Sequence, residues 1–74
     1  MQDNVNHPAH YTQGKVEVIE IIEQLTNGME GHKAYCLGNV IKYIMRHENK
    51  NGLEDLKKAS WYLQRVIERE IRNE

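Results

Sequence analysis

Hydrophobic residues recur at helical spacing in three separate segments of this chain. In the first segment, apolar residues at positions 18, 19, 22 and 25 share one side, and glutamates at 17, 20 and 23 lie on the other. Asn27-Gly28 comes next, a pair typical of a helix end. We therefore expect a first helix from Val16 to Leu25. A strand is the alternative, because the segment is rich in β-branched residues.

The second segment runs from Gly31 to Arg46 or His47 and carries two strips at helical spacing. The apolar strip consists of Leu37, Val40, Ile41, Ile44 and Met45. The polar strip consists of Asn39, Lys42, Tyr43 and Arg46. Its two cations, amide and phenol form a donor-rich surface suited to a phosphate or a nucleotide, with an ordinary solvated face as the alternative. Glycine at 38 is unfavourable inside a helix, so we expect another helix or a ligand to approach closely there.

The third and longest helix is predicted from Leu53 to Ile71, after a loop of turn-forming residues at 48–52. Its apolar positions keep a repeat close to 3.5 residues: Leu53, Leu56, Ser60, Leu63, Ile67 and finally Glu70 or Ile71. This stretch is short for an independent coiled coil, but it suffices for a bundle or a dimer seam.

Residues 1–14 are predicted to be an extended arm, because Pro8 disfavours helix and Gly14 closes the segment. The fold class is therefore all-α, a single domain over 1–74 with an arm at 1–14 and a three-helix bundle at 15–74. A 74-residue chain buries only about 60% of its unfolded surface, and one cysteine allows no internal disulfide. We expect a homo-oligomer to complete the core, since apolar residues lie on more than one side of the helices.

Charge narrows the classes of partner. The net charge of −1 argues against general nucleic-acid binding, yet residues 42–65 hold six cations against three acids, which suits a local anion site. The polar first residues and the lack of an apolar run near 18 residues predict neither a secretory signal nor a membrane span. The single cysteine, Cys36, fits a reducing cytoplasm, and its apolar neighbours favour a core residue over a nucleophile.

Metal chemistry is weakly supported. His7 and His10 are spaced for chelation, but no convincing third ligand accompanies them. A structural pair, or hydrogen bonds to a ligand, is the favoured interpretation. No acid lies between Lys33 and His47, which argues against a helical pyrophosphatase, and no phosphate-binding P-loop motif is present. We expect neither a metal nor a cofactor.

The third helix carries a second polar strip, formed by Lys58, Trp61, Tyr62 and Arg65. Together with Tyr11 and Tyr43, these aromatic residues could stack on a base while Lys42, Arg46 and Lys58 hold phosphates. We expect Trp61 instead to pack against the first helix with its polar tip in water. For Tyr43 and Tyr62 both interpretations stay open.

Four segments together carry a family resemblance: Asn6-His7-Pro8-x-His10-Tyr11, residues 16–22, the run from Cys36 to Arg46, and Glu54-Asp55-Leu56-Lys57-Lys58-Ala59-x-Trp61-Tyr62-Leu63. In this combination the chain resembles the SaV-like family of small phage and prophage proteins. That family is of unknown function and is often labelled nucleotide kinase. The label reflects a longer coliphage enzyme that phosphorylates deoxynucleoside monophosphates without a P-loop.

The resemblance implies a nucleotide-binding protein in the cytoplasm of an infected or lysogenic bacterial host. Our favoured hypothesis is binding without catalysis, in which the chain sequesters a nucleotide or cyclic nucleotide, such as a signal of host anti-phage defence. A nucleotide kinase acting on deoxynucleoside monophosphates is the alternative, and a helical module that binds a host protein is a further one. The predicted ligand residues are Asn6, His7, His10, Tyr11, Asn39, Lys42, Tyr43, Arg46, Lys58 and Tyr62.

Two substitutions test this hypothesis. We expect the pocket near a subunit interface, closed by the arm. Arg46→Ala is predicted to abolish binding while leaving helical content and oligomer mass unchanged, because a residue of the polar strip is not a core residue. Leu63→Asp is predicted to break the assembly and to reduce binding with it.

Overall fold

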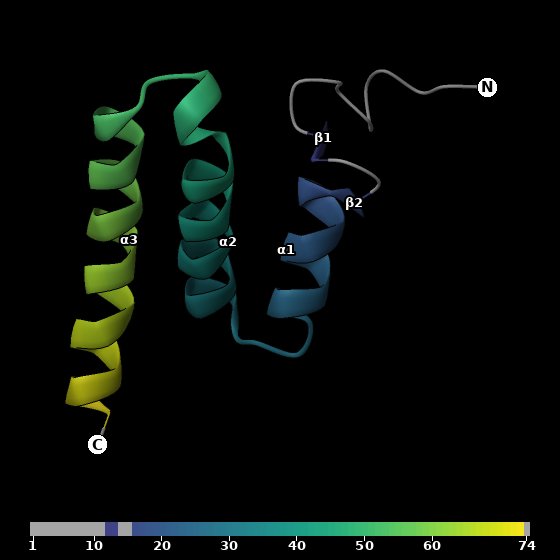
Figure 1. Cartoon of the computed structure of the whole chain (residues 1–74). Helices are drawn as coiled ribbons and strands as arrows, with labels where there is room; N and C mark the ends of the chain where they lie inside the picture. Colours follow the sequence, from purple (N-terminus) through teal and green to yellow (C-terminus); the bar gives the residue numbers. More distant parts are fainter. Residues whose placement is uncertain (1–11, 14–15, 74) are drawn as a thin grey trace.

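The computed structural model describes residues 12–13 and 16–73, and the predictions for residues 1–11 lie outside this range. A strand pair precedes the helices: β1 (Thr12–Gln13) is antiparallel to β2 (Val16–Glu17). Three α-helices come next, α1 (Val18–Thr26), α2 (Gly31–Arg46) and α3 (Leu53–Arg72), with a 3-10 turn η2 (His47–Asn49) after α2 (Figure 1). The predicted all-α class with three helices is confirmed.

The first helix begins two residues later than predicted. Val16 and Glu17 pair with β1, so the strand alternative holds for these two residues and the helix for the rest. Glu17 precedes the helix in an extended conformation and makes no side-chain hydrogen bond to the helix N-terminus. Val16 is β-branched and pairs with Gln13 of β1. Because β-branched residues favour an extended backbone in a strand pair, the helix begins two residues later.

The helices form a layer in which α2 lies between its two neighbours. α2 packs against α3 on one side and α1 on the other, and Figure 1 shows α1 and α3 at opposite edges. Gly38 of α2 lies at the contact with α1, where an added Cβ would come 3.2 Å from Cγ2 of Ile22. The predicted close helix approach at Gly38 is therefore confirmed.

Two short connections set the helix ends. The Glu30 side chain accepts hydrogen bonds from the backbone N–H groups of His32 and Lys33, at 3.2 and 2.9 Å, and so caps α2. Before α3, Gly52 has a positive φ of 53° and its N–H donates to the carbonyl oxygen of His47 at 2.7 Å. This turn reverses the chain so that α3 runs back along α2.

The buried apolar core of the described residues is small: Val18, Cys36, Val40, Ala59 and Val66. Cys36 is thus a core residue, as predicted, and its Sγ lies 3.9 Å from Nε2 of His32. By contrast, Trp61 is 58% exposed on α3, which has no packing face toward α1. The expectation that Trp61 packs against the first helix is wrong. No helix among the described residues is long and apolar enough to cross a membrane.

Candidate functional site

The two predicted polar strips meet on one side of the α2–α3 pair, around the ring of Tyr43. The Nζ atoms of Lys42 and Lys58 lie 4.7 and 5.5 Å from the ring centroid, and Cζ of Arg46 lies 4.8 Å from it. Lys42 and Arg46 come from α2, whereas Lys58 reaches across from α3. Three cations within reach of one aromatic ring form a local concentration of positive charge. We call this surface the Tyr43 face; its residues are Tyr35, Asn39, Lys42, Tyr43, Arg46, Lys58, Trp61 and Tyr62.

A chain of aromatic contacts extends from Tyr43 along the α2–α3 contact. Tyr62 stacks on Tyr43, with ring centroids 6.0 Å apart, and meets Tyr35 and Trp61 edge to face at 5.9 and 5.0 Å. Tyr43 and Tyr62 are half-buried in these contacts, whereas Tyr35 is 63% exposed. The rings with free surface for a ligand are therefore Tyr35 and Trp61.

Hydrogen bonding with Tyr35, together with burial and the neighbouring Tyr43, raises the pKa of the Tyr62 hydroxyl above its ordinary value of 10.0. The sequence-based prediction missed Tyr35. Its place four residues before Asn39 and seven before Lys42 puts it on the same helical strip, and that spacing was the available signal. The side chain of Asn39 donates from Nδ2 to the Tyr35 carbonyl oxygen at 2.9 Å, so part of its hydrogen-bonding capacity is already used within the helix.

Arg46 has a structural partner in Asp55, which has no exposed surface. Its Nε and Nη2 donate to the two carboxylate oxygens of Asp55, each at 3.3 Å, and the Asn51 backbone N–H donates to one of them at 3.1 Å. Burial alone would raise the pKa of Asp55, but these hydrogen bonds outweigh it and hold the pKa below 3.8. Arg46 therefore belongs to the polar strip and also balances a buried charge, which gives a reason to expect Arg46→Ala to lower stability.

Lys42 and Lys58 have weaker interactions with other protein groups than Arg46 has. Lys58 lies 3.9 Å from Glu54 in an exposed pair one helical turn apart, a contact of small energetic weight. Lys42 forms no ion pair with a carboxylate of the described residues. The Tyr43 face therefore presents two ammonium groups to solvent beside exposed aromatic rings, an arrangement that suits an anion with an aromatic part.

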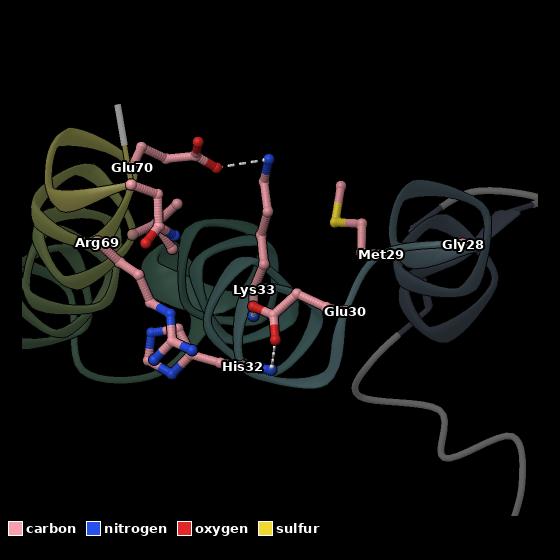
Figure 2. A pocket seen from close by; sticks show the side chains of 9 residues that line it. Gly28, Met29, Glu30, His32, Lys33, Arg69 and Glu70 are labelled. Atoms are coloured by element: carbon pink, nitrogen blue, oxygen red, sulfur yellow. Dashed lines mark hydrogen bonds and ion pairs between the residues drawn. The ribbon is translucent and has the colours of Figure 1, made fainter.

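A cavity of about 500 Å³ lies at the other end of the α2–α3 pair, where the α1–α2 connection meets the end of α3 (Figure 2). It is lined by Gly28, Met29, Glu30, His32, Lys33, Val66, Arg69, Glu70 and Asn73. Its charges are largely balanced by one another. Lys33 and Glu70 form a 2.7 Å ion pair, and the hydrogen bond from the Lys33 backbone N–H lowers the pKa of Glu30. No sequence pattern had singled out this cavity.

The remaining predicted ligand residues, Asn6, His7, His10 and Tyr11, lie outside the described residues. Within the described residues, no three His, Cys, Asp or Glu side chains come together as a potential metal site.

The sequence profile of a family described as a protein of unknown function, DUF3310, matches residues 5–64. This chain belongs to the DUF3310 family. The matched range contains every residue of the Tyr43 face, whereas the part of the cavity formed by α3 lies beyond residue 64. The predicted membership in a phage protein family of unknown function, with a relative named as a nucleotide kinase, is confirmed.

Two phage proteins resemble this DUF3310 chain. The Gene 1.7 protein of Enterobacteria phage T3 is 40% identical over 67 residues, which cover 84% of this chain and 40% of that protein. Nucleotide kinase gp1.7 of Escherichia phage T7 is 37% identical over 65 residues, which cover 81% of this chain and 33% of that protein. The chain thus spans two fifths or less of the length of these relatives. No solved structure matches it.

Proposed function

We propose that this chain binds a nucleotide at the Tyr43 face, with Lys42 and Lys58 on the phosphates and an exposed ring, Tyr35 or Trp61, against the base. The observation that carries the proposal is the grouping of three cations within 5.5 Å of one tyrosine ring. Asn6, His7, His10 and Tyr11, which lie outside the described residues, complete the proposed ligand set as predicted from the sequence.

The balance of charge supports a phosphate ligand. Asp55 offsets Arg46, and Glu54 is too distant and too exposed to offset Lys58 strongly, so an excess of positive charge stays on the surface. Ammonium groups beside half-buried rings bind phosphate oxygens through charge-assisted hydrogen bonds, which are stronger than neutral ones.

The length of the face supports a nucleotide rather than free phosphate. Seven residues separate Tyr35 from Lys42, which corresponds to about 10 Å along a helix. A ligand that touches both must carry its aromatic and anionic groups at opposite ends, as a nucleotide does. Stacking on exposed aromatic side chains tolerates any base, so the face predicts the class of ligand and leaves the base open.

Sequestration without catalysis is our primary proposal for the outcome of binding, with a cyclic nucleotide of host anti-phage signalling as the favoured ligand. Phosphoryl transfer to a deoxynucleoside monophosphate is the second candidate, and the name of the T7 relative, nucleotide kinase, favours it. Transfer requires two nucleotides held in line and neutralisation of the phosphoryl charge. The sequence-based hypothesis assigns this role to Lys42, Arg46 and a histidine, and because Asp55 already offsets Arg46, Lys42 would carry most of it.

Isothermal titration calorimetry tests binding, with a panel of cyclic dinucleotides and deoxynucleoside mono- and triphosphates. We expect Lys42→Ala and Lys58→Ala each to weaken binding by about tenfold or more, the effect of losing a charged hydrogen bond. Lys57→Ala removes the same charge from the exposed residue next to Lys58 and should change affinity less than twofold. Absence of binding at high micromolar nucleotide, or an equal effect of Lys57→Ala, would refute the Tyr43 face as the site.

Chromatography separates the two candidate outcomes. The protein is incubated for hours with a nucleoside triphosphate, each deoxynucleoside monophosphate and Mg²⁺. Appearance of the diphosphates, lost in Lys42→Ala and kept in Lys57→Ala, would support the kinase. If the nucleotides stay unchanged although calorimetry shows that the protein binds them, the result would support sequestration.

A further inference from the structure

The outer side of α3 carries a stripe of exposed apolar side chains. Leu56, Leu63 and Ile67 are 40–43% exposed, and Leu53 and Ile71 are 67% and 63% exposed. With Ser60 they recur every three or four residues over nearly the whole helix, and we call this set the outer stripe. Large apolar side chains aligned in this way are typical of a helix that packs against another helix.

The outer stripe differs from the face that α3 turns toward α2. That face is defined by the buried residues Asp55, Ala59 and Val66. At about 100° per residue, the outer stripe is centred roughly a third of a turn from it. α3 lies at the edge of the helix layer, with α2 on one side only (Figure 1). None of the described helices covers the outer stripe.

The outer stripe also lies apart from the Tyr43 face. On the same helical projection, Lys58 and Tyr62 point roughly opposite to the centre of the outer stripe. The stripe and the proposed nucleotide site therefore occupy different sides of the layer, and a partner on one leaves the other accessible.

We infer that the outer stripe pairs with the outer stripe of a second copy of this chain, with the two α3 helices antiparallel. Such a contact is isologous: when a residue of one copy meets a given residue of the second copy, the reverse contact also forms. In the antiparallel register Leu56 faces Ile67 of the second copy, and Ser60 faces Leu63. In this register the two heptad core positions alternate across the seam from residue 56 to residue 67.

Charge complementarity selects the antiparallel direction. Lys57 and Glu68 border the outer stripe on the same flank and are exposed, and neither forms an ion pair with another described residue. Antiparallel pairing brings each Lys57 near Glu68 of the second copy, twice by symmetry. In a parallel pair the same flanks of the two helices lie on opposite sides of the seam, so Lys57 and Glu68 of different copies would not meet.

Light scattering and sedimentation of the full chain test the pairing. We expect a dimer whose dissociation constant rises at least tenfold in Ile67→Asp. Ile19→Asp is the matched control, since Ile19 is 46% exposed on α1, and it should stay dimeric. Circular dichroism checks that both variants keep their helices. A wild-type monomer at high micromolar concentration, or dissociation by Ile19→Asp rather than Ile67→Asp, would overturn the inference.

Cysteine cross-linking tests the direction. Ser60→Cys lies close to the symmetry axis of the antiparallel seam and should form a disulfide-linked dimer under mild oxidation. Leu53→Cys should not, because its counterpart is then at the far end of the seam. Cross-linking of both variants would show a parallel dimer and overturn the direction, and the wild type controls for Cys36.

Lys57→Glu and Glu68→Lys should each weaken the dimer, and the double variant should restore it; additive weakening would contradict the proposed contact.

Discussion

Asp55 is the residue on which the α2–α3 junction depends, because its carboxylate is buried and is satisfied by Arg46 and Asn51. Arg46→Ala should therefore lower stability more than Lys42→Ala or Lys58→Ala, since it alone leaves a buried charge without its counter-ion. Urea unfolding of the three variants measures the difference. Equal midpoints would show that Arg46 contributes to the Tyr43 face and not to the fold.

The same carboxylate predicts a response to acid. Because the pKa of Asp55 is lower in the folded chain than its ordinary 3.8, its stabilisation is complete above that value and is lost as the pH falls through the folded pKa. Asp55→Asn should flatten the dependence of thermal stability on pH below about 4, although it lowers stability at neutral pH. Glu54→Gln, at the exposed neighbouring position, should keep the wild-type profile.

Tyr62 gives a spectroscopic prediction. Its pKa is raised by hydrogen bonding with Tyr35, so Tyr35→Phe should lower the pKa of Tyr62 toward 10.0. Absorbance of tyrosinate at alkaline pH reports this titration in variants that keep Tyr62, with Tyr62→Phe as the control that identifies its contribution. The neutral phenol stabilises the fold below the unfolded pKa, and this contribution is lost as the pH rises through the folded one.

For individual residues, the sequence predicted which side chains share a helical strip better than it predicted which groups they contact. Helical spacing placed Lys42 and Tyr43 on one strip of α2, as the structure shows, whereas only the structure shows that Lys58 of α3 reaches the same ring. It could not reveal that Arg46 meets Asp55, because that contact joins two helices through a turn whose geometry depends on Gly52. The periodicity of a single helix carries no information about which group on the next helix lies opposite.

Among the elements, the turn into α3 is the most demanding in backbone conformation. Gly52 has φ 53° and ψ −119°, a combination that residues with a Cβ rarely adopt. Gly52→Ala should destabilise the chain by about 1–3 kcal/mol. Gly31→Ala is the matched control, since Gly31 lies in the first turn of α2 with no atom near its added Cβ. That change should be neutral or stabilising by about 0.4–1 kcal/mol. Thermal unfolding compares them, and equal losses would contradict the role of the positive φ.

Helix extents were predicted closely where capping and turn signals were present. α2 begins at Gly31 and ends at Arg46 as expected, whereas the first helix gave two residues to a strand pair. That pairing depends on Thr12 and Gln13 of β1, and the hydrophobic periodicity of the helix gives no information about these residues.

For the whole molecule, the two proposals together predict that assembly and ligand binding are independent, because the outer stripe and the Tyr43 face lie on different sides of the helix layer. Ile67→Asp should dissociate the proposed dimer yet change nucleotide affinity less than twofold, whereas Lys42→Ala should weaken binding and leave the dimer intact. Calorimetry and sedimentation on the same samples measure both. This differs from the sequence-based expectation that the pocket lies near a subunit interface, and a parallel loss of both properties would restore that expectation.

The arrangement of helices was the least predictable feature. Apolar residues on several sides of α1 and α3 indicated contacts beyond a single neighbour, but not that α2 would separate these two helices. Trp61 was misplaced for this reason. A hydrophobic pattern shows which face of a helix avoids water, and the covering partner depends on loop geometry and on other chains.

The ion pairs at the two ends of the α2–α3 pair have a consequence for the order in which the chain opens. Arg46–Asp55 fastens one end and Lys33–Glu70 the other, whereas α1 is held by its packing against α2. Amide hydrogen exchange should therefore proceed in stages, with the N–H groups of α1 exchanging through local opening while those in the middle of α2 and α3 stay protected. On this hierarchy, α1 and the strand pair before it open first, and α2 and α3 form the more stable unit of the chain.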